Sequence, residues 1–363
     1  MIRNSLLGGL CVALLAACST APLHTSTPPA PAPKTAADAI LQEAWVSEPV
    51  PGDELDSLVA WPTEDGRVWL IATAKATHHL ALYDADTGQR LRTVGGPGTA
   101  VGQFNRPNGI AVFGDLLFVA ERDNHRVQAF RLPEFAPLGA FGADVLRSPY
   151  GLWVHEPAPG ELELFVTDSF MADFRTMTLP PMAELAGRVK RFQVRIEDGG
   201  KLETRLLGQF GDTGAAGALR MVESIAGDPA HGRLLIAEED RRVGSTLRDY
   251  TLAGHYNGRS LATFDADAEG IALWACSAED GYWVAVDQLT PTRFRVFDRA
   301  TLAPAGVFSG KVTSNTDGET VYAMPTPRFP AGALFALHND VSLAAFDLRD
   351  IARALDLKGD CPR

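Results

Sequence analysis

The feature that most constrains this fold is a series of short apolar runs that continues from about residue 45 almost to the C-terminus. Each run lasts about four to six residues and is bounded by Gly, Asp, Asn or Pro, as strands joined by tight turns require. The clearest runs cover residues 68–71, 80–83, 109–112, 116–119, 127–130, 162–166, 192–196, 234–237, 282–286, 294–297 and 334–337. Only residues 348–357 have the spacing of a helix. The sequence therefore predicts an all-β chain, either a sandwich or a propeller.

A repeating unit decides between these two folds. It reads Gly-apolar-apolar, turn, apolar run, turn, and then an alternating run that ends in Phe or Tyr, as at residues 69–84, 109–130 and 270–298. Blades of about 45–55 residues divide the roughly 320 residues of this region into six or seven units. Radial repetition also removes exposed sheet edges. We therefore predict a six-bladed β-propeller over residues 41–358 and a short tail at 359–363.

The first residues indicate a targeting signal. An apolar run at residues 6–15 is too short to span a membrane as a mature helix. It ends in Leu15-Ala16-Ala17-Cys18, which resembles the lipobox of bacterial lipoproteins. The resemblance implies a signal peptide over residues 1–17, acylation of Cys18 and membrane anchoring through it. Because Ser19 rather than Asp follows, it implies an outer-membrane lipoprotein of the bacterial cell envelope. An ordinary signal peptide with an incidental cysteine is the alternative.

Residues 18–40 are rich in Pro, Ala and Thr and have no apolar periodicity. We expect them to form an extended linker between the lipid anchor and the propeller. Of the four cysteines, Cys11 lies in the signal peptide and Cys18 at the lipidation site, which leaves Cys276 and Cys361. An oxidising compartment permits a disulfide between them. The spacing alone leaves pairing and free thiols equally open.

The charge balance excludes one class of partner. The chain has 33 Lys and Arg against 45 Asp and Glu, a formal net charge of −12. An acidic protein repels the phosphate backbone of a nucleic acid, so we expect no nucleic-acid partner, and we expect a monomer. The same balance argues against an anionic substrate, unless bound cations neutralise the acids where that substrate binds.

Carboxylates are the candidate functional groups. Glu223, Glu239, Asp267, Glu269 and Asp317 lie beside apolar runs, at strand ends or between blades. In a propeller, such positions from different blades converge at one mouth of the central channel. Converging carboxylates raise one another's pKa unless a cation neutralises them. Oxygen ligands in a site with many ligands favour Ca²⁺ over Zn²⁺. The sequence therefore predicts a site for several Ca²⁺ ions.

Two resemblances to known families sharpen this prediction. Residues 95–130, with Gly109-Ile110-Ala111-Val112 and Asn124-His125-Arg126, resemble an NHL repeat, which is a signature of a propeller blade. A larger region, residues 45–357, resembles the β-propeller phytases. The motifs that carry this resemblance are Glu223-Ser224-Ile225-Ala226, Leu235-Ile236-Ala237-Glu238-Glu239-Asp240, Asp267-Ala268-Glu269-Gly270-Ile271, Thr316-Asp317-Gly318 and Phe329-Pro330-Ala331-Gly332-Ala333-Leu334-Phe335.

The phytase resemblance implies a Ca²⁺-dependent phosphomonoester hydrolase that releases phosphate from phytate or a similar organic phosphate. The metal ligands that it implies are Asp56, Glu223, Glu239, Asp267, Glu269 and Asp317. The catalytic set that it implies is Glu239, Asp267, Glu269, Asp317 and Tyr150. Lys75 and Arg122 match family positions that contact phosphate, for which a point charge and a two-pronged donor are suited.

The chain also departs from the family pattern. Lys311 stands where the family has a second acid ahead of its Thr-Asp-Gly motif, and Ser169 stands where it has another phosphate-binding lysine. Lys190 is a possible substitute for that lysine. The departures favour a second hypothesis, a non-enzymatic NHL-type propeller lipoprotein that binds a protein or a glycan. A third is a lactone or sugar-phosphate hydrolase on the same scaffold.

Overall fold

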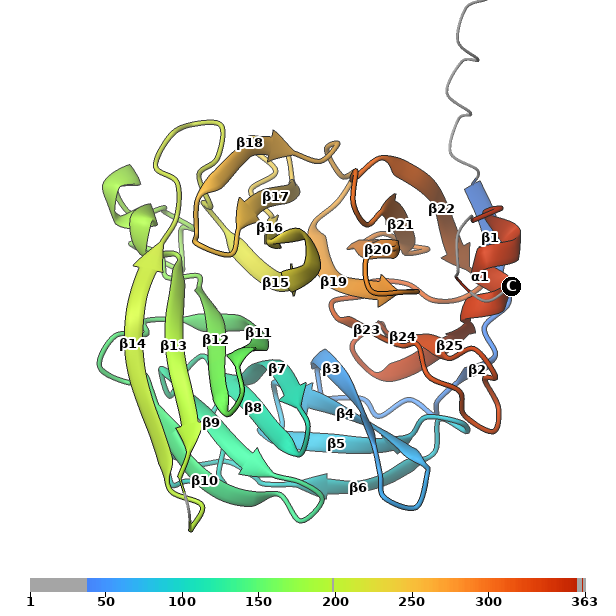
Figure 1. The fold of residues 1–363 in the computed structure, drawn as a ribbon, viewed down its shortest axis with the longest axis horizontal. Coiled ribbons are helices and arrows are strands. Elements are labelled where there is room, and N and C mark those ends of the chain that lie inside the picture. The colour runs from blue at the N-terminus through green and yellow to red at the C-terminus, as the bar shows by residue number, and fades with distance from the viewer. Residues whose placement is uncertain (1–37, 198, 358–360, 362–363) are drawn as a thin grey trace, which may run out of the picture. The chain divides into compact units, whose positions relative to one another are not determined.

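The computed structural model describes residues 38–197, 199–357 and 361. The predicted signal peptide, Cys18 and most of the predicted linker lie outside these residues. The described part contains six sheets that are arranged around one axis (Figure 1). The prediction of an all-β, six-bladed propeller is therefore confirmed.

Within each blade, strands that follow one another in the chain lie side by side as an antiparallel meander, and two N-terminal strands add to the outer edges of the last two sheets. The first two blades contain β3 (Leu55–Pro62), β4 (Val68–Ala74), β5 (His79–Asp84) and β6 (Arg90–Val94), then β7 (Pro107–Phe113), β8 (Leu116–Glu121), β9 (Arg126–Arg131) and β10 (Ala136–Phe141). The third contains β11 (Pro149–Ala158), β12 (Glu161–Asp168), β13 (Val189–Ile196) and β14 (Leu202–Phe210). The fourth contains β15 (Val222–Asp228), β16 (Arg233–Glu238), β17 (Thr246–Thr251) and β18 (Tyr256–Ser260).

The last two blades are built from both ends of the described chain. The fifth contains β19 (Ala268–Ala275), β20 (Gly281–Asp287), β21 (Arg293–Asp298) and β22 (Pro304–Gly310), and β1 (Asp38–Leu41) pairs with β22 in parallel. The sixth contains β23 (Glu319–Tyr322), β24 (Ala333–His338) and β25 (Ser342–Asp347), and its outermost strand is β2 (Trp45–Val46). The predicted linker extends to residue 40, so its last three residues lie in β1.

The strand β2 closes the circle of blades. It pairs with β25 through Trp45 and Val46, so a segment from the start of the propeller completes its last sheet. The indole of Trp45 packs against Phe335 at a ring distance of 5.9 Å and donates a hydrogen bond of 3.1 Å to the Ala85 carbonyl of the first blade. Trp45 therefore ties the last blade to the first.

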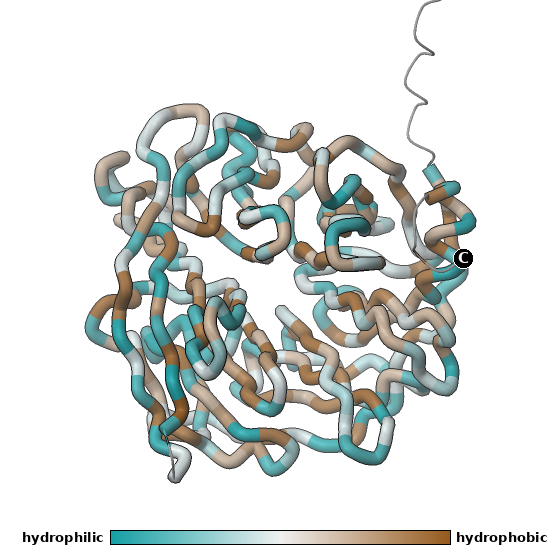
Figure 2. The backbone as a smooth tube through the Cα atoms, viewed as in Figure 1, coloured by the Kyte–Doolittle hydropathy of each residue, from teal (hydrophilic) through white to brown (hydrophobic). Residues whose placement is uncertain are grey.

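The innermost strands form the wall of a central channel. Each of β3, β7, β11, β15, β19 and β23 contacts the next, and β23 contacts β3. They enclose a cavity of about 440 Å³. Apolar residues recur along the strands of every blade (Figure 2). Those that face a neighbouring blade form the cores, such as the cluster that joins Ile71 and Leu82 of the first blade to Val119 and Phe130 of the second. Hydrophobic burial between blades therefore holds the ring together.

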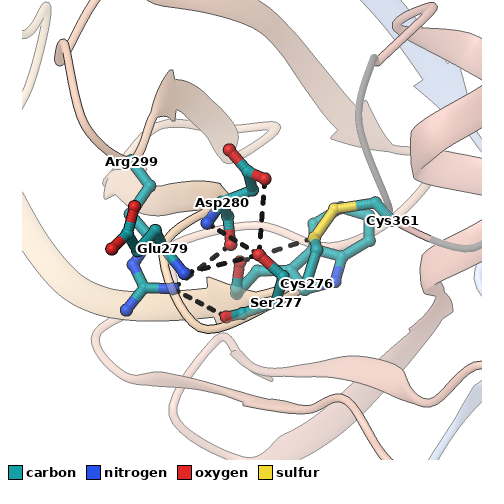
Figure 3. Close-up of a disulfide and its surroundings, with 7 residues drawn as sticks. Cys276, Ser277, Glu279, Asp280, Arg299 and Cys361 are labelled. Carbon is teal, nitrogen blue, oxygen red and sulfur yellow. Dashed lines mark hydrogen bonds between the residues drawn. A yellow bond between two sulfur atoms is a disulfide. The ribbon is translucent and has the colours of Figure 1, made fainter. Parts of the chain in front are cut away.

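A disulfide joins the loop between β19 and β20 to the C-terminal segment. Cys276 and Cys361, which the sequence leaves as possible partners, are bonded to each other (Figure 3). Arg299 holds the same loop by donating hydrogen bonds of 3.1 and 3.2 Å to the carbonyls of Ser277 and Asp280. The bond closes a loop of 85 residues and limits the freedom of the unfolded chain.

Helices are few in the described part of the chain. The short helix α1 (Leu348–Ala354) begins where the sequence predicts helical spacing, and Asp347 caps it by accepting a hydrogen bond of 2.8 Å from the amide of Arg349. Two 3-10 helices, η1 (Met182–Gly187) and η2 (Pro229–His231), lie in loops.

Within the described residues, no helix has the length and apolar character needed to cross a membrane.

Candidate cation site at the channel mouth

One mouth of the channel is built from a three-residue pattern that occurs once in each blade. The pattern is a polar residue, then Gly or Ser, then an aliphatic residue, except that Glu319 replaces the aliphatic residue in the sixth blade. The Gly or Ser and the residue after it line the channel in all six blades. The polar positions, which we call the inner ring, are Asp56, Asn108, Tyr150, Glu223, Glu269 and Asp317.

A local distortion of the backbone places the inner ring. In the first five blades the register of the innermost pair shifts across these residues, for example between Leu55 and Leu58 and between Val222 and Ile225. Such a bulge turns a side chain away from the regular alternation of the strand. The inner-ring residues are thereby released from the packing between blades.

Small residues let the blades approach one another at this mouth. A Cβ atom on Gly109 would lie 2.0 Å from the Tyr150 carbonyl oxygen, and one on Gly151 would lie 2.6 Å from the Glu223 carbonyl oxygen. A side chain at either position would push the neighbouring blade away. The Gly and Ser positions therefore bring the polar residues of successive blades together.

A second set of residues surrounds the inner ring. It consists of the residue that follows the second strand of each blade: Lys75, Arg122, Ser169, Glu239, Gln288 and Asn339. In five blades the backbone N–H of this residue donates to the carbonyl two positions before the inner-ring residue, as Glu239 does to Met221 at 2.9 Å. In the sixth blade, Asn339 donates to Ser314, three positions before Asp317. We call this set the outer ring.

Three glutamates meet on one side of the mouth, and we call them the mouth glutamates. Glu223, Glu239 and Glu269 each offer a carboxylate oxygen, and these atoms all lie within 4.8 Å of one another. Burial, and then repulsion from neighbouring acids, raises the pKa of all three carboxyls well above the usual value. Within the described chain, no Lys or Arg forms an ion pair with any of them.

The pKa values of the mouth glutamates have specific causes. After burial, Glu269 is the strongest influence on the pKa of Glu223 and of Glu239, whereas Asp317 is the strongest on the pKa of Glu269. The interaction between the Glu239 and Glu269 side chains raises the pKa of Glu239 further and opposes the rise in the pKa of Glu269. Burial and then repulsion from Glu223 likewise raise the pKa of the Tyr150 hydroxyl.

A lysine neutralises the acids on the other side of the mouth. The ammonium of Lys75 lies 2.8 Å from Asp56 Oδ1 and 3.1 Å from Asp317 Oδ2. Burial alone would lower the pKa of Lys75, but attraction to the two carboxylates raises it above its usual value. Burial raises the pKa of Asp317 to about 7 although Lys75 opposes that shift.

Two amides complete the lysine side of the mouth. Asn108 Nδ2 donates to Asp56 Oδ2 at 3.2 Å, and Gln288 Nε2 donates to Asp317 Oδ1. Each oxygen of Asp56 and Asp317 therefore has an N–H donor. Asn108 is fully buried, and its Oδ1 has no hydrogen-bond partner among the described residues. Such an acceptor is costly unless a ligand, cation or water satisfies it.

Four other acids have a different role, and we call them the loop-capping acids. Glu121, Asp168, Glu238 and Asp287 each end the second strand of a blade and are fully buried. They accept hydrogen bonds from backbone N–H groups in the loop that leads to the innermost strand. Asn105 donates to Glu121, Ser148 to Asp168, Met221 to Glu238, and Ala266 to Asp287. These acids hold the loops that carry the inner ring.

Two predicted site residues form ion pairs of their own outside the group of three mouth glutamates. Asp267 forms a two-pronged ion pair with Arg241 at 2.5 and 2.7 Å, and it is near enough to raise the pKa of Glu239 and Glu269. Arg122 pairs with Asp123 at 2.7 Å and lines a separate cavity of about 320 Å³ with His125 and Arg147. The structure therefore brings Asp56, Lys75, Tyr150, Glu223, Glu239, Glu269 and Asp317 together. Asp267 lies near them but is paired with Arg241, and Arg122 lies at a separate cavity.

The structure also shows where the residues lie at which the chain departs from the phytase pattern. Lys190 is buried, with its ammonium 3.2 Å from Asp168 Oδ2, so it is committed to a loop-capping acid. Ser169 occupies its outer-ring position without a basic side chain. Lys311 lines a cavity of about 810 Å³ beside β1 and β22.

Sequence reasoning missed two residues of the mouth, Asn108 and Gln288. Asn108 has the same Gly-aliphatic continuation as Glu269, so a search for this pattern once per blade would have found it. Gln288 follows the loop-capping acid Asp287 in the same way that Glu239 follows Glu238. Both residues can be found from their position in the repeated pattern. A search for acids misses them, because neither is an acid.

The mouth glutamates suit a hard divalent cation. They provide clustered, half-buried carboxylate oxygens that form no ion pair, and loss of hydration makes their ionised form unfavourable. Ca²⁺ accepts six to eight oxygen ligands in flexible geometry. Tyr150 and the buried Asn108 Oδ1 are further oxygen donors in the inner ring.

Comparisons with known proteins agree with the fold. The family model of the NHL repeat matches residues 104–130. These residues run from the end of the loop between β6 and β7 through β7 and β8 into β9 of the second blade. No curated protein matches the chain. Among solved structures, a chain in the crystal structure of a nidogen/laminin complex is 15% identical with a TM-score of 0.51, over 75% of this chain and 87% of that chain.

A second solved structure is hydrazine synthase of Kuenenia stuttgartiensis. It is 11% identical with a TM-score of 0.46, over 85% of this chain and 99% of that chain. At such identities the likeness to solved structures concerns the fold alone. The chain is thus a six-bladed β-propeller with an NHL repeat in its second blade.

Proposed function

We propose that the channel mouth binds a divalent cation, Ca²⁺ by the hardness of the ligands, and through it an anionic group of a ligand. The observation that carries this proposal is the convergence of Glu223, Glu239 and Glu269 within 4.8 Å, with half-buried side chains that form no ion pair to a Lys or Arg of the described chain. Three ionised glutamates at this spacing would repel strongly, so a cation is the simplest source of their stability.

One use of such a site is hydrolysis of a phosphomonoester such as phytate. A bound Ca²⁺ would neutralise the glutamates and the phosphate and would lower the pKa of a bound water. Lys75 retains a third N–H beyond its two carboxylate partners, which can donate to a phosphate oxygen. The raised pKa of Tyr150 keeps its hydroxyl protonated at neutral pH, so it can donate as well. Arg122 would contact a more distant phosphate.

The other use is binding without catalysis. The NHL repeat in the second blade and the likeness to a chain of a nidogen/laminin complex support a propeller that binds a protein or glycan at least as well. The placement of Arg122 beside Asp123, away from the mouth glutamates, also favours this use. Of the two uses, the comparisons favour binding, whereas the chemistry of the mouth is what suggests hydrolysis.

Phosphate release from phytate, measured with excess Ca²⁺ and with chelator, separates the two uses. Hydrolysis requires release that depends on Ca²⁺ and is lost in Glu239→Gln. The control Asp115→Asn changes an exposed acid that pairs with Arg131 in the turn after β7, away from the mouth, and should keep wild-type release. Calcium binding without release leaves a cation-binding propeller, and absence of calcium binding contradicts the proposal.

A further inference from the structure

We infer that Lys75 takes the place of a second cation, so that the mouth binds one divalent ion rather than several. The inference deepens the proposed function and rests on it, because it assumes that the mouth glutamates hold an ion. It assigns to Lys75 a positioning role as a fixed counter-ion for Asp56 and Asp317.

The first observation is the difference in partners between the two sides of the mouth. The Lys75 ammonium contacts both Asp56 and Asp317, at 2.8 and 3.1 Å, and these contacts bridge the first and sixth blades. The side chain of Lys75 is only 12% exposed, and those of the two aspartates are 7% and 13% exposed. A lysine on a protein surface is mobile and its ion pairs are weak. The Lys75 ammonium is instead fixed between two carboxylates that have little contact with solvent.

The second observation is that the lysine side has no vacant carboxylate oxygen. Asn108 and Gln288 donate to the two oxygens that Lys75 leaves free. A cation placed between Asp56 and Asp317 would have to displace the ammonium and turn both amides, since N–H groups do not ligate metals. The mouth glutamates, in contrast, require no exchange of partners to accept a cation.

The third observation is the buried acceptor beside this pair. Asn108 Oδ1 has no partner within the described residues, although Nδ2 of the same amide is bonded to Asp56. If Lys75 lost its charge, Asp56, Asp317 and Asn108 Oδ1 would form an oxygen cluster of their own. Removal of the ammonium should therefore create a second ion site. It should not merely weaken binding at the mouth glutamates.

Calorimetric titration of the full chain with Ca²⁺ tests the inference. We expect one ion per wild-type chain and two per chain for Lys75→Met. Asp317→Asn should still bind one ion, with a dissociation constant within about threefold of wild type, because Asp317 serves Lys75. Glu239→Gln should lose the ion, with binding weakened at least tenfold.

The outcomes distinguish this inference from the proposed function. Two or more ions in wild type, or a tenfold loss of affinity in Asp317→Asn, overturns the role of Lys75 and leaves the cation site standing. A single ion in a folded Lys75→Met also overturns it. If Lys75→Met does not fold, Asp317→Asn decides the question, since it retains the pair between Lys75 and Asp56. No binding by wild type removes the proposed function itself.

Discussion

Glu238 and Glu239 are consecutive glutamates, yet the first is fully buried and the second half-buried, and their carboxyl groups have different partners. Glu238 accepts hydrogen bonds from the backbone N–H groups of Arg220, Met221 and Asp240, and so it acts as part of the scaffold. Glu239 lies beside Glu223 and Glu269 and has no cationic partner. A buried carboxylate with several donors stabilises a fold, whereas buried carboxylates that face one another strain it until a ligand arrives.

The same contrast extends around the propeller. The loop-capping acids satisfy backbone groups in four blades, whereas the mouth glutamates belong to the fourth and fifth blades only. The comparison teaches that the number of acids near the channel does not measure its capacity for cations. What matters is which acids already have donors.

The largest expected effect concerns the adjacent pair. Glu238→Ala should lower the free energy of unfolding by about 3 kcal/mol, because each buried N–H left without an acceptor costs about 1–3 kcal/mol. Glu239→Ala, measured with chelator, should change it by less than about 1 kcal/mol or increase it, since repulsion is relieved. Urea denaturation of both variants measures the difference. Equal losses in the two variants would contradict the division between scaffold and mouth.

The next effect is stabilisation by calcium. At a hundredfold excess over Kd, a ligand that binds only the folded state adds about 2.7 kcal/mol to the free energy of unfolding. We expect this gain in wild type and in Asp115→Asn, and we expect its loss in Glu239→Gln. Thermal unfolding with Ca²⁺ and with chelator provides the measurement. A gain that persists in Glu239→Gln would place the stabilising ion elsewhere.

A smaller effect concerns pH. The pKa of Asp317 is raised from 3.8 to about 7 in the folded chain, so the folded state holds this proton more tightly than the unfolded state. The associated stability is present below about pH 4 and is lost as the pH rises to about 7. With chelator, the free energy of unfolding of wild type relative to Asp317→Asn should therefore fall between pH 5 and pH 8. A constant difference over this range would contradict the raised pKa.

The smallest effect is expected at Asp267. Asp267 pairs with Arg241, whose side chain is 60% exposed, and exposed ion pairs contribute about 0.2–1 kcal/mol. Asp267→Asn should therefore cost less than about 1 kcal/mol and leave the affinity for Ca²⁺ within about threefold of wild type. Calorimetry checks both this variant and Glu239→Gln. An equal loss of affinity in the two would make Asp267 a member of the cation site.

Much of the fold could be predicted because it repeats. Short runs bounded by turn residues recur along the chain, and the length of the region divided by the length of a blade leaves six or seven blades. The closure by β2 could not be predicted in this way, since two residues of strand carry no periodic signal. Its evidence is Trp45, whose partners Phe335 and Ala85 are distant in the sequence.

The site could be predicted only in part. Convergence of Glu223, Glu239 and Glu269 followed from their positions at the edges of strands. The separation of Glu238 from Glu239 did not, because it depends on which residue the strand end directs toward the loop. The pairing of Lys75 with Asp317 joins residues that are 242 positions apart, so it depends on the closed ring. The positions of these residues in the sequence predicted which of them meet at the channel mouth. The closed ring of blades determined which of them pair with each other.

The most direct test of the cation site is anomalous diffraction from crystals soaked in Ca²⁺. We expect one ion, bound by carboxylate oxygens of Glu223, Glu239 and Glu269 at about 2.3–2.6 Å. Lys75 should remain between Asp56 and Asp317 in the same crystals. An empty glutamate cluster at saturating Ca²⁺ would contradict the central claim, as would an ion that binds only elsewhere in the chain.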